Sequence, residues 1–549
     1  MDAKKQIIES LVKAVGELVP DEQIDVELQE PKDESHGDYS SNVALVLGKK
    51  FHQNPQELAK KILDIGNWKF LDKVEAVAPG FINFYLSYDY LIDQLQEVSM
   101  QGQALRGKKI MVEFTDPNPF KEFHIGHLYS NAVGEALCRL LESQGATVKR
   151  VNYQGDVGLH IAKSLYAILQ ISNLEKKNPK ERAKFLGKAY ARGAKAYEED
   201  EAAKKEINIL NKKIYENDAS IRELYQKGRE WSLEHFETIY KRLGTKFEGY
   251  YFESVVGKIG LEYVRKHMDI FQESQGAVIF PGEKYGLHNR VFINSLGLPT
   301  YEAKELGLAP TKYKDFPYDL SIIVTGNEIN AYFSVLLKAL SLINPDLAAK
   351  TKHIGHGMVR LPTGKMSSRT GVVLTGEWLL DEAKERIQRA YKQMDETTAE
   401  KVAVGAVKYA LLKSGIGRDI SFSFEESISL EGNSGPYLQY TYARTQSVLA
   451  KVSSIKYQVL SIKLEPEELA ILRAVHKFPE ISQEAAEKFA PNLLCTYLFD
   501  LAQKFNLFYQ KHKILESEEK EFRLALTASV GQVLKTGLYL LGIIAPERM

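Results

Sequence analysis

The sequence predicts an α/β protein with a parallel sheet in its first half and a mostly helical second half. Residues 108–114 contain the apolar run of a buried strand, and apolar residues after Gly126 recur at helical spacing as far as Ser143. Residues 147–153 have the pattern of a second strand. Strand, helix and strand in that order form a βαβ unit, whose two strands are parallel. From Val402 onward the hydrophobic spacing is helical.

The composition is that of a globular protein without an overall electrostatic bias. The chain has 549 residues, 44% of them hydrophobic, and a length for about three to four domains. Its 72 basic and 72 acidic residues balance, so any contact with nucleic acid must come from local patches. Cys138 and Cys495 are its only cysteines, which argues against a disulfide framework or a zinc site. The charged start is unlike a signal peptide and no apolar run reaches the roughly 18 residues of a membrane span, so a cytoplasmic location without a membrane partner is expected.

Residues 1–106 are expected to form a small α+β domain. Four apolar residues of the opening segment lie on one helical face: Ile7, Leu11, Val15 and Leu18. Residues 37–42 supply turn and cap residues before a second helix. Residues 81–86, entered through a turn at 77–80, have the pattern of a strand.

The most informative stretch of the central part begins where its first strand ends. Pro117 and Pro119 prevent a regular ladder, and His124-Ile125-Gly126-His127 then stands at the N-terminus of the helix. A helix N-terminus stabilises anions, and Gly126 lets a ligand approach the backbone. Both histidines can donate hydrogen bonds to phosphate oxygens. The alternative is a polar helix cap with two surface histidines.

The same four letters recur at His353-Ile354-Gly355-His356, so the tetrapeptide alone decides nothing. A short apolar run and Pro362 follow the second copy, which favours a strand that leads into the next loop. That loop, residues 361–371, contains glycines near both ends and carries Lys365 and Arg369. It can close on a polyphosphate and stabilise a departing pyrophosphate. For the loop on its own, a solvated basic turn is the alternative.

Two further stretches of the central part are informative. Residues 165–250 are rich in Lys, Glu and Ala and are interpreted as a charge-laced helical pair inserted between two halves of the sheet. Glu253 follows an aromatic run expected to be buried, where a guanidinium could form a bidentate pair with it. An internal salt bridge is the alternative. Residues 320–326 read as a strand followed by polar residues up to Asn330, at the end where parallel sheets bind ligands.

Some nucleotide-binding classes are not indicated. The sequence has no Gly-x-Gly-x-x-Gly and no Walker-type loop. A dinucleotide-binding enzyme and a P-loop enzyme are therefore not expected.

Together, the first pair of histidines and the Lys365-Met366-Ser367 loop resemble the two signature motifs of class I aminoacyl-tRNA synthetases. Residues 115–121, Thr-Asp-Pro-Asn-Pro-Phe-Lys, narrow the resemblance to the arginyl-tRNA synthetases. It extends over nearly the whole chain, from Gly37-Asp38-Tyr39 to the closing Ala545 to Met549. Departures from the family pattern include Val157 in place of a tryptophan.

The resemblance implies a particular domain order. A Rossmann-like parallel-sheet catalytic domain would span 107–380, with the helical insertion at about 165–250. A small N-terminal domain at 1–106 would contact tRNA. A connecting helical region at 381–430 would lead to an all-α anticodon-binding domain at 431–549. The implied activity is ATP-dependent attachment of L-arginine to tRNA(Arg) through an arginyl-adenylate, with Mg²⁺ bound to the ATP and no metal site in the protein itself.

The resemblance also implies the residues that bind each substrate. Those implied for catalysis are His124, His127, Lys121, Lys365 and Arg369. Those implied for ATP are Gly126, Met366 and Ser367, with the two histidines. Those implied for arginine are Asn118, Glu253, Tyr301, Glu305 and Asn330. Tyr301 and Glu305 are four residues apart and would share one helical face, with Glu305 replacing the usual aspartate.

Five residues of the last domain are implied for tRNA: Tyr437, Tyr440, Asn506, Tyr509 and Met549. Residues 493–509 are its clearest helix, with Tyr497, Leu501, Phe505 and Phe508 on the core face. Asn506 and Tyr509 fall beside that face. Exposed aromatic side chains there could stack on unpaired bases, and packing in the core is the alternative.

Two other functions remain as alternatives. A small-molecule nucleotidyltransferase shares the two histidines at a helix start, but it would not need a helical tail such as residues 431–549. An inactive, synthetase-like RNA-binding protein would not need His124, His127 and Lys365 intact. A monomer is expected.

Overall fold

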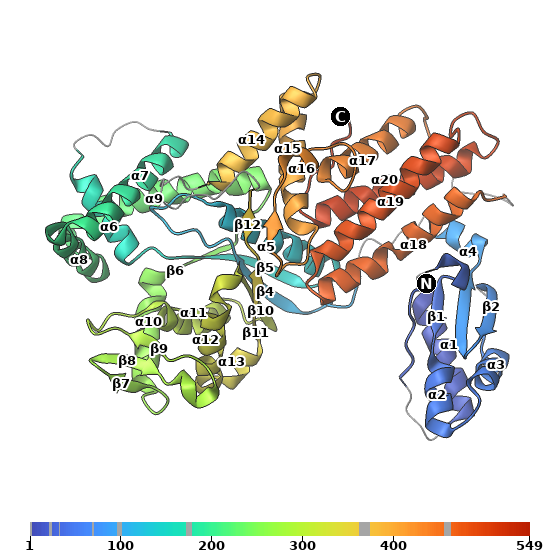
Figure 1. The fold of residues 1–549 in the computed structure, drawn as a ribbon, viewed down its shortest axis with the longest axis horizontal. Coiled ribbons are helices and arrows are strands. Elements are labelled where there is room, and N and C mark those ends of the chain that lie inside the picture. The colour runs from blue at the N-terminus through green and yellow to red at the C-terminus, as the bar shows by residue number, and fades with distance from the viewer. Residues whose placement is uncertain are drawn as a thin grey trace. The chain divides into compact units, whose positions relative to one another are not determined.

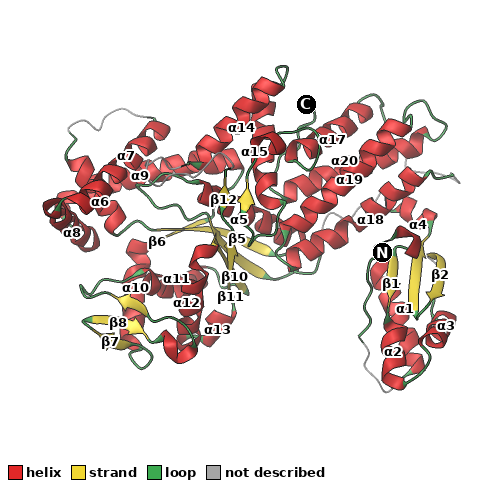
Figure 2. Ribbon diagram, in the orientation of Figure 1, coloured by secondary structure: helices red, strands yellow, loops and turns green. Residues whose placement is uncertain are grey.

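The computed structural model describes residues 3–20, 25–31, 33–68, 71–95, 102–171, 178–361, 374–454 and 463–549. The chain divides into two compact units, each built from separate stretches of sequence. Unit 1 consists of Met1–Val98, Val448–Phe478 and Gln503–Val533. Unit 2 consists of Ser99–Ser447, Pro479–Ala502 and Leu534–Met549. Figures 1 and 2 show the elements of both units.

Unit 1 contains a small antiparallel sheet with helices beside it (Figure 2). The strand order is β1-β3-β2, with β1 at Tyr39–Ser41, β2 at Leu71–Val77 and β3 at Phe81–Leu86. Its helical elements are α1 (Ala3–Leu18), η1 (Glu34–His36), α2 (Val43–Phe51), α3 (Pro55–Ile65) and α4 (Tyr88–Asp93). Ile7, Leu11 and Val15 are buried on one face of α1, as their spacing predicts. The expected α+β character of this region is confirmed.

Unit 1 also contains parts of three long helices from near the other end of the chain. These helices are α18 (Pro466–Glu487), α19 (Pro491–Lys511) and α20 (Lys520–Leu540). Arg473 of α18 forms an ion pair with Asp38, with Nε 2.8 Å from Oδ1. The Ser529 hydroxyl of α20 donates to the carbonyl of Leu95 at 2.9 Å. The N-terminal elements are therefore packed against C-terminal helices within one unit.

Unit 2 is organised around a five-stranded parallel sheet with the strand order β11-β10-β4-β5-β6. The strands are β4 (Lys109–Phe114), β5 (Thr147–Gln154), β6 (Gly249–Phe252), β10 (Leu320–Gly326) and β11 (Thr351–His356). Helix α5 (Ile125–Ser143) connects β4 to β5, which confirms the predicted βαβ unit. The helix lies close against the sheet at Gly134, where a Cβ would be only 2.1 Å from Cγ of Phe114.

The insertion between β5 and β6 contains more helices than the predicted pair. Its helices are α6 (Leu159–Leu169), α7 (Pro179–Glu199), α8 (Glu201–Glu216) and α9 (Ala219–Leu243). Asp200 ends α7 and also caps α8, and Asp218 caps α9. An aspartate can start a new helix by accepting hydrogen bonds from its first N–H groups. Because the whole run is charged, hydrophobic spacing alone did not reveal these breaks.

A second group of elements follows β6 in the sequence (Figure 1). Its helical elements are α10 (Glu253–Lys266), η2 (Gly282–Tyr285), α11 (Tyr301–Asp315), η3 (Asn327–Ile329), α12 (Asn330–Ile343) and α13 (Pro345–Ala349). It also contains a small antiparallel sheet of β7 (Gln272–Ser274), β8 (Ala277–Phe280) and β9 (Arg290–Ile293). This sheet was not predicted from the sequence.

The helical part of the chain begins earlier than the Val402 inferred from the sequence. Helix α14 (Gly376–Ala390) comes first, followed by α15 (Glu396–Leu412), α16 (Phe424–Ser427) and α17 (Gly435–Leu449). A short parallel pair, β12 (Val359–Arg360) and β13 (Ile420–Ser421), lies among them. Across the part of the chain that the structure describes, no helix is both long enough and apolar enough to cross a membrane.

Candidate active site

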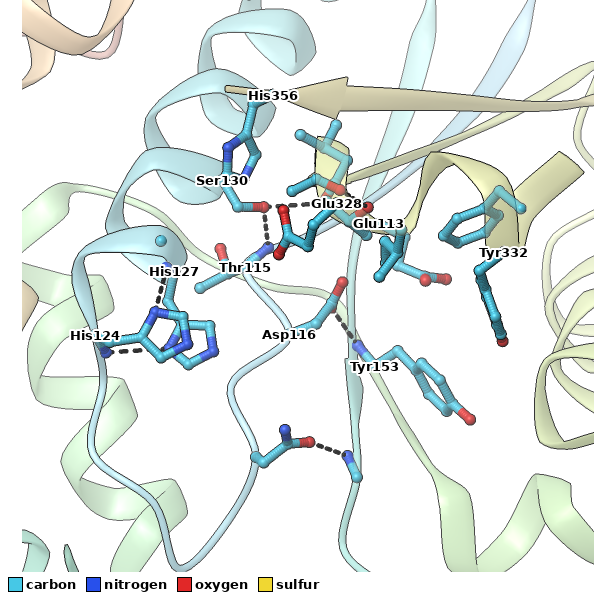
Figure 3. Close-up of a pocket in the computed structure, with 18 of the residues that line it drawn as sticks. Glu113, Thr115, Asp116, His124, His127, Ser130, Tyr153, Glu328, Tyr332 and His356 are labelled. Carbon is cyan, nitrogen blue, oxygen red and sulfur yellow. Dashed lines mark hydrogen bonds between the residues drawn. The ribbon is translucent and has the colours of Figure 1, made fainter. Parts of the chain in front are cut away.

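A cavity of about 770 Å³ opens at the carboxyl ends of the parallel strands. Figure 3 shows His124 and His127 on one side, Tyr153 and Tyr332 on the other, and Asp116 between them. The lining residues that the sequence predicted are Asn118, His124, Gly126, His127, Glu253, Tyr301 and Glu305. Residues more than 180 positions apart in the sequence therefore meet in one cavity, at the edge where parallel sheets bind ligands.

The two histidines at the start of α5 cap the helix reciprocally. His124 is the N-cap, and its Nδ1 accepts a hydrogen bond from the backbone N–H of His127 at 3.4 Å. The backbone N–H of His124 donates in turn to Nδ1 of His127 at 3.2 Å. The two rings stack with centroids 3.5 Å apart. Because each Nδ1 accepts, the proton of each neutral ring lies on Nε2.

The surroundings keep both rings neutral near pH 7. His124 is partly open to solvent, but desolvation by the surrounding protein, with the nearby positive charge of Lys121, lowers its pKa to about 4. His127 is the more enclosed ring, and its burial lowers its pKa well below the usual value. Each ring can therefore offer an uncharged Nε2–H donor at the helix N-terminus, where anions are stabilised.

The loop between β4 and α5 has an unusual backbone that hydrogen bonds hold in place. Thr115 has φ +79° and Asp116 has φ +42°, a region that non-glycine residues seldom adopt. The Thr115 N–H donates to the Ser130 hydroxyl at 2.9 Å, and that hydroxyl donates to the Val324 carbonyl at 2.9 Å. Asp116 accepts from the Tyr153 N–H at 2.7 Å, as the dashed lines of Figure 3 show. Helix α5 and strands β5 and β10 thus all support this loop.

Asn118 and the turn after β5 approach each other closely. The N–H of Gly155 donates to Oδ1 of Asn118 at 3.1 Å. A Cβ on Gly155 would lie 2.4 Å from that oxygen and 3.2 Å from Oε1 of Glu253. A glycine is therefore required for the three residues to meet. With its oxygen occupied, Asn118 has its side-chain NH₂ group left to donate.

Glu253 is not the lone carboxylate that its sequence context suggested. Its side chain is 3% exposed, and Oε2 lies 2.6 Å from Nζ of Lys304, which is 4% exposed. The internal salt bridge, left as an alternative above, is therefore present. Burial alone would lower the pKa of Lys304, but the Glu253 carboxylate raises it above the usual lysine value. The second carboxylate oxygen of Glu253 can still face the cavity, because Glu253 is one of the lining residues.

The cavity contains more acidic groups than basic ones. Glu113 pairs with Lys312 at 2.6 Å, and Glu302 pairs with Arg290 at 3.2 Å. Asp116 and Glu305 form no ion pair among the described residues, and their burial beside Glu113 raises the pKa of both well above normal. A cationic ligand would lower the pKa of both carboxyl groups again, because it would stabilise their charged forms.

Sequence reasoning missed several of the lining residues. They are Glu113, Asp116, Tyr153, Arg290, Glu302 and Tyr332, whereas Glu328 lies in the polar run expected after β10. Asp116 and Tyr153 could have been found, since each lies at the carboxyl end of a parallel strand. Arg290 and Glu302 could not, because the small sheet that carries Arg290 was itself unpredicted.

The second histidine motif lies closer to the cavity than its sequence context indicated. It forms β11, as predicted, but His356 at the strand end lines the cavity. The residues of a strand alternate between faces, so His353, three positions earlier, faces the other way. His353 hydrogen-bonds with the Thr325 hydroxyl at 2.7 Å and stacks on Phe333. The two halves of this motif therefore have different surroundings.

Other sequence-predicted residues are not among the lining residues. The ammonium of Lys121 lies 4.9 Å from the ring centroid of Tyr190, and Asn330 is exposed at the start of α12. Residues 362–371 of the predicted phosphate loop lie outside the described residues, and they include Lys365, Met366, Ser367 and Arg369. Within the described part of the chain, no cluster of three or more His, Cys, Asp or Glu is arranged to hold a metal ion.

The residues implied for tRNA are divided between the two units. Tyr437 and Tyr440 lie half-buried on α17 in unit 2, where Tyr437 packs edge-on against Phe499. Asn506 and Tyr509 lie on the part of α19 that belongs to unit 1. Asn506 is 8% exposed and so belongs with the core residues of α19, while Tyr509 is 40% exposed.

The chain matches three protein-family models in succession. Residues 91–424 match tRNA synthetases class I (R), catalytic domain. Residues 438–549 match the DALR anticodon binding domain, and residues 2–86 match the arginyl tRNA synthetase N terminal domain.

Similar individual proteins span the whole chain. An arginine–tRNA ligase of Flavobacterium psychrophilum is 32% identical, with 90% of each chain covered. Arginine–tRNA ligase 1 of Bacillus cereus is 31% identical, with both chains fully covered. Among solved structures, Thermus thermophilus arginyl-tRNA synthetase superposes with a TM-score of 0.84 at 25% identity over the full length of both chains. A Plasmodium falciparum arginyl-tRNA synthetase has the same fold, with a TM-score of 0.82 at 23% identity, covering 100% of this chain and 99% of its own.

Proposed function

The chain belongs to the arginyl-tRNA synthetases, and we propose that it attaches L-arginine to its cognate tRNA in an ATP-dependent reaction through an arginyl-adenylate. The observation that carries this function is one cavity with two histidine donors at a helix start on one side and, on the other, carboxylates that form no ion pair within the described part of the chain. One end suits the phosphates of ATP and the other suits a guanidinium. The class I catalytic domain and the anticodon binding domain agree with this activity.

The reaction needs no nucleophile from the protein. In the first step the arginine carboxylate attacks the α-phosphorus of ATP, and the bond to pyrophosphate breaks. In the second step a hydroxyl of the terminal tRNA ribose attacks the arginyl carbonyl, and AMP leaves. The protein contributes by positioning the reactants and by stabilising charge that develops on the phosphates.

On the phosphate side, we assign the main role to the start of α5. His124 and His127 would donate their Nε2–H groups to phosphate oxygens, and Gly126 would allow the nucleotide to approach the backbone. The donors are neutral and held by the reciprocal cap, so they need little reorganisation during the reaction. Lys121, Lys365 and Arg369 are proposed to stabilise the pyrophosphate, and Met366 and Ser367 to complete the ATP site. Mg²⁺ would arrive bound to the ATP.

On the arginine side, Glu305 and Tyr301 are proposed to bind the guanidinium. Glu305 forms no ion pair among the described residues, and its burial beside Glu113 raises its pKa although Lys312 is near, so a guanidinium would stabilise its charged form. Glu253 would contribute its second oxygen beside Lys304. Asn118, with its NH₂ group left to donate, would bind the carboxylate or amino end of the substrate. Asn330 stays a prediction from the family pattern.

For tRNA, we propose contacts from the N-terminal domain and from the helical C-terminal domain. Tyr437, Tyr440, Asn506, Tyr509 and Met549 remain the proposed contact residues, and the exposed Tyr509 is the best placed of them to stack on a base. The domain limits 1–106, 107–380, 381–430 and 431–549 are proposed on the same basis. A monomeric state and a cytoplasmic location also stay predictions.

The test is ATP–pyrophosphate exchange, measured with each amino acid in turn and with or without tRNA. We expect exchange with arginine and much less with lysine, which lacks the planar fork of a guanidinium. Transfer of labelled arginine to tRNA(Arg) should follow. Exchange without transfer to tRNA would favour a small-molecule nucleotidyltransferase, and tRNA binding without exchange would favour an inactive RNA-binding protein.

A further inference from the structure

Helix α9 of the insertion presents four residues to the turns that surround the cavity. Tyr225, Gly228, Arg229 and Ser232 are spaced i, i+3, i+4 and i+7, so they share one face of the helix. None of them lines the cavity itself. Each nevertheless contacts a segment that leads directly to a lining residue.

The first contact is with the loop between β4 and α5. The N–H of Phe120 donates to the Ser232 hydroxyl at 2.9 Å. A Cβ on Gly228 would lie 2.3 Å from Cε1 of Phe120, so the aromatic ring packs directly on the helix backbone. Phe120 itself has φ +65° and is completely buried. The loop that carries Asn118 and His124 is thus fixed to α9 at its centre.

The second contact is with Asp156, whose side chain is completely buried. The Tyr225 hydroxyl donates to Oδ2 of Asp156 at 3.0 Å. The Ser254 N–H donates to Oδ1 at 2.8 Å, and the Ser254 hydroxyl donates to Oδ2 at 2.7 Å. Asp156 directly follows Gly155, and Ser254 directly follows Glu253. One carboxylate therefore connects α9 to the loop after β5 and to the start of α10, both of which face the arginine end of the cavity.

The third contact is made by Arg229, which lies beside the same carboxylate of Asp156. Nε of Arg229 lies 3.5 Å from Oδ2 of Asp156, and the guanidinium carbon lies 3.8 Å from the ring centroid of Phe252. A guanidinium over an aromatic face is favourable, more so where water is excluded. Phe252 ends β6 and Glu253 begins α10, so the strand-to-helix junction that carries Glu253 is held on both sides.

From these contacts we infer that α9 sets the affinity of the cavity for arginine, with Tyr225, Arg229 and Asp156 as positioning residues. This inference deepens the proposed function and rests on it. Tyr225 and Arg229 act through Asp156 on the segments that carry Gly155 and Glu253, and they make no contact with the histidine pair among the described residues. Loosening them should therefore weaken arginine binding and leave ATP binding nearly unchanged.

The test uses Tyr225→Phe, which removes one donor to Asp156 and keeps the aromatic ring on Phe120. In arginine-dependent exchange we expect the KM for arginine to rise about fivefold, as for loss of one hydrogen bond of ordinary strength, with the KM for ATP within about twofold of wild type. Ser254→Ala removes a different donor to the same carboxylate and should give the same pattern. Each substitution removes only one hydroxyl group, so both variants should fold. The thermal midpoint of each variant checks this, and the KM values are measured below that temperature.

Tyr197→Phe is the matched control. Tyr197 lies on α7 of the same insertion, where its ring packs under the ammonium of Lys163 at 4.4 Å. The same chemical change there should alter neither KM value. The inference is overturned if Tyr225→Phe leaves the KM for arginine unchanged, or raises both KM values equally. Absence of arginine-dependent exchange in the wild-type protein with tRNA present would instead contradict the proposed function itself.

Discussion

The backbone determines where the proton sits on each histidine at the start of α5. Each Nδ1 accepts a backbone N–H, so the ring must present Nε2–H to the cavity. A protonated ring could not accept at Nδ1, and the reciprocal cap would break. The neutral state and the capping geometry therefore support each other.

Replacing His127 with Ala removes a positioned donor and half of the cap. We expect kcat to fall by about 10²–10³-fold, as when one donor to a developing oxyanion is lost. His124→Ala should have a similar effect. Single-turnover measurement of adenylate formation would test this, with His288→Ala as a control because His288 is exposed. A loss confined to the tRNA transfer step would contradict the assigned role.

Substitutions at the Glu253–Lys304 pair can distinguish its contribution to stability from its contribution to arginine binding. Glu253→Gln leaves the buried Lys304 ammonium without a counter-charge, which should cost roughly 3–5 kcal/mol of unfolding free energy. It should also raise the KM for arginine. Adding Lys304→Met removes the stranded charge, so stability should recover while the KM stays high.

Denaturant unfolding and arginine-dependent exchange on both variants would measure these two effects. Recovery of the arginine KM in the double variant would mean that Glu253 matters to arginine only through Lys304.

At the scale of elements, strand β11 shows how one motif can carry two roles. His356 lines the cavity, and its Nδ1 is 2.8 Å from the Gly357 carbonyl, which can only accept. The neutral ring therefore keeps Nε2 as an acceptor. His353 instead makes contacts within the protein, a hydrogen bond with Thr325 and a stacking contact with Phe333.

These surroundings predict different outcomes for equivalent changes. His356→Phe keeps an aromatic ring beside Tyr129 but loses both the Nε2 acceptor and the Nδ1–H donor to the Gly357 carbonyl. The KM for ATP should therefore rise several-fold, with a loss of stability of about 1–2 kcal/mol for the unpaired carbonyl. His353→Phe should lower the thermal midpoint and leave the KM for ATP unchanged. Equal changes in the KM for ATP at the two positions would contradict the separate roles assigned to His356 and His353.

Elements with strong hydrophobic periodicity were predictable from the sequence. Strand β4, helix α5 and strand β10 all lie close to their expected limits, because each buries a regular set of apolar residues. The position of the histidines at the start of α5 followed from that. The parallel sheet in turn indicated which edge would bind ligands.

Contacts between distant segments were not predictable. Lys304 pairs with a residue 51 positions earlier, and Tyr225 reaches Asp156 from 69 positions later. Neither pairing affects the local hydrophobic spacing from which elements are predicted. The strands β7, β8 and β9 are only three or four residues long, too short for alternation to stand out.

For the molecule as a whole, buried titratable groups act on stability in opposite directions as pH falls. His160 is 7% exposed, and burial lowers its pKa to about 3. The unfolded chain binds a proton at this histidine below about pH 6.5, whereas the folded chain does not. Its contribution to stability is therefore complete above pH 6.5 and is lost as pH falls toward 3. Asp116 and Glu305, with raised pKa values, act in the opposite sense.

Comparison of the wild type with His160→Gln isolates the histidine contribution. Between pH 6 and pH 5 the wild-type unfolding free energy should fall more steeply than that of the variant, by roughly 1 kcal/mol per pH unit. Denaturant titrations at several pH values would measure both slopes. Parallel slopes would mean that His160 is protonated in the folded protein.

The contacts of Asp38 and Leu95 with α18 and α20 have a consequence for how the protein is made. Asp38 and Leu95 leave the ribosome long before the helices they pack against, because α18 begins only at Pro466. At roughly 5–20 residues per second, the N-terminal segment waits tens of seconds for its partners. During that time the surface that will cover α18 stays open to chaperones and to unwanted association. A chain released before α18 is translated would leave this surface permanently uncovered.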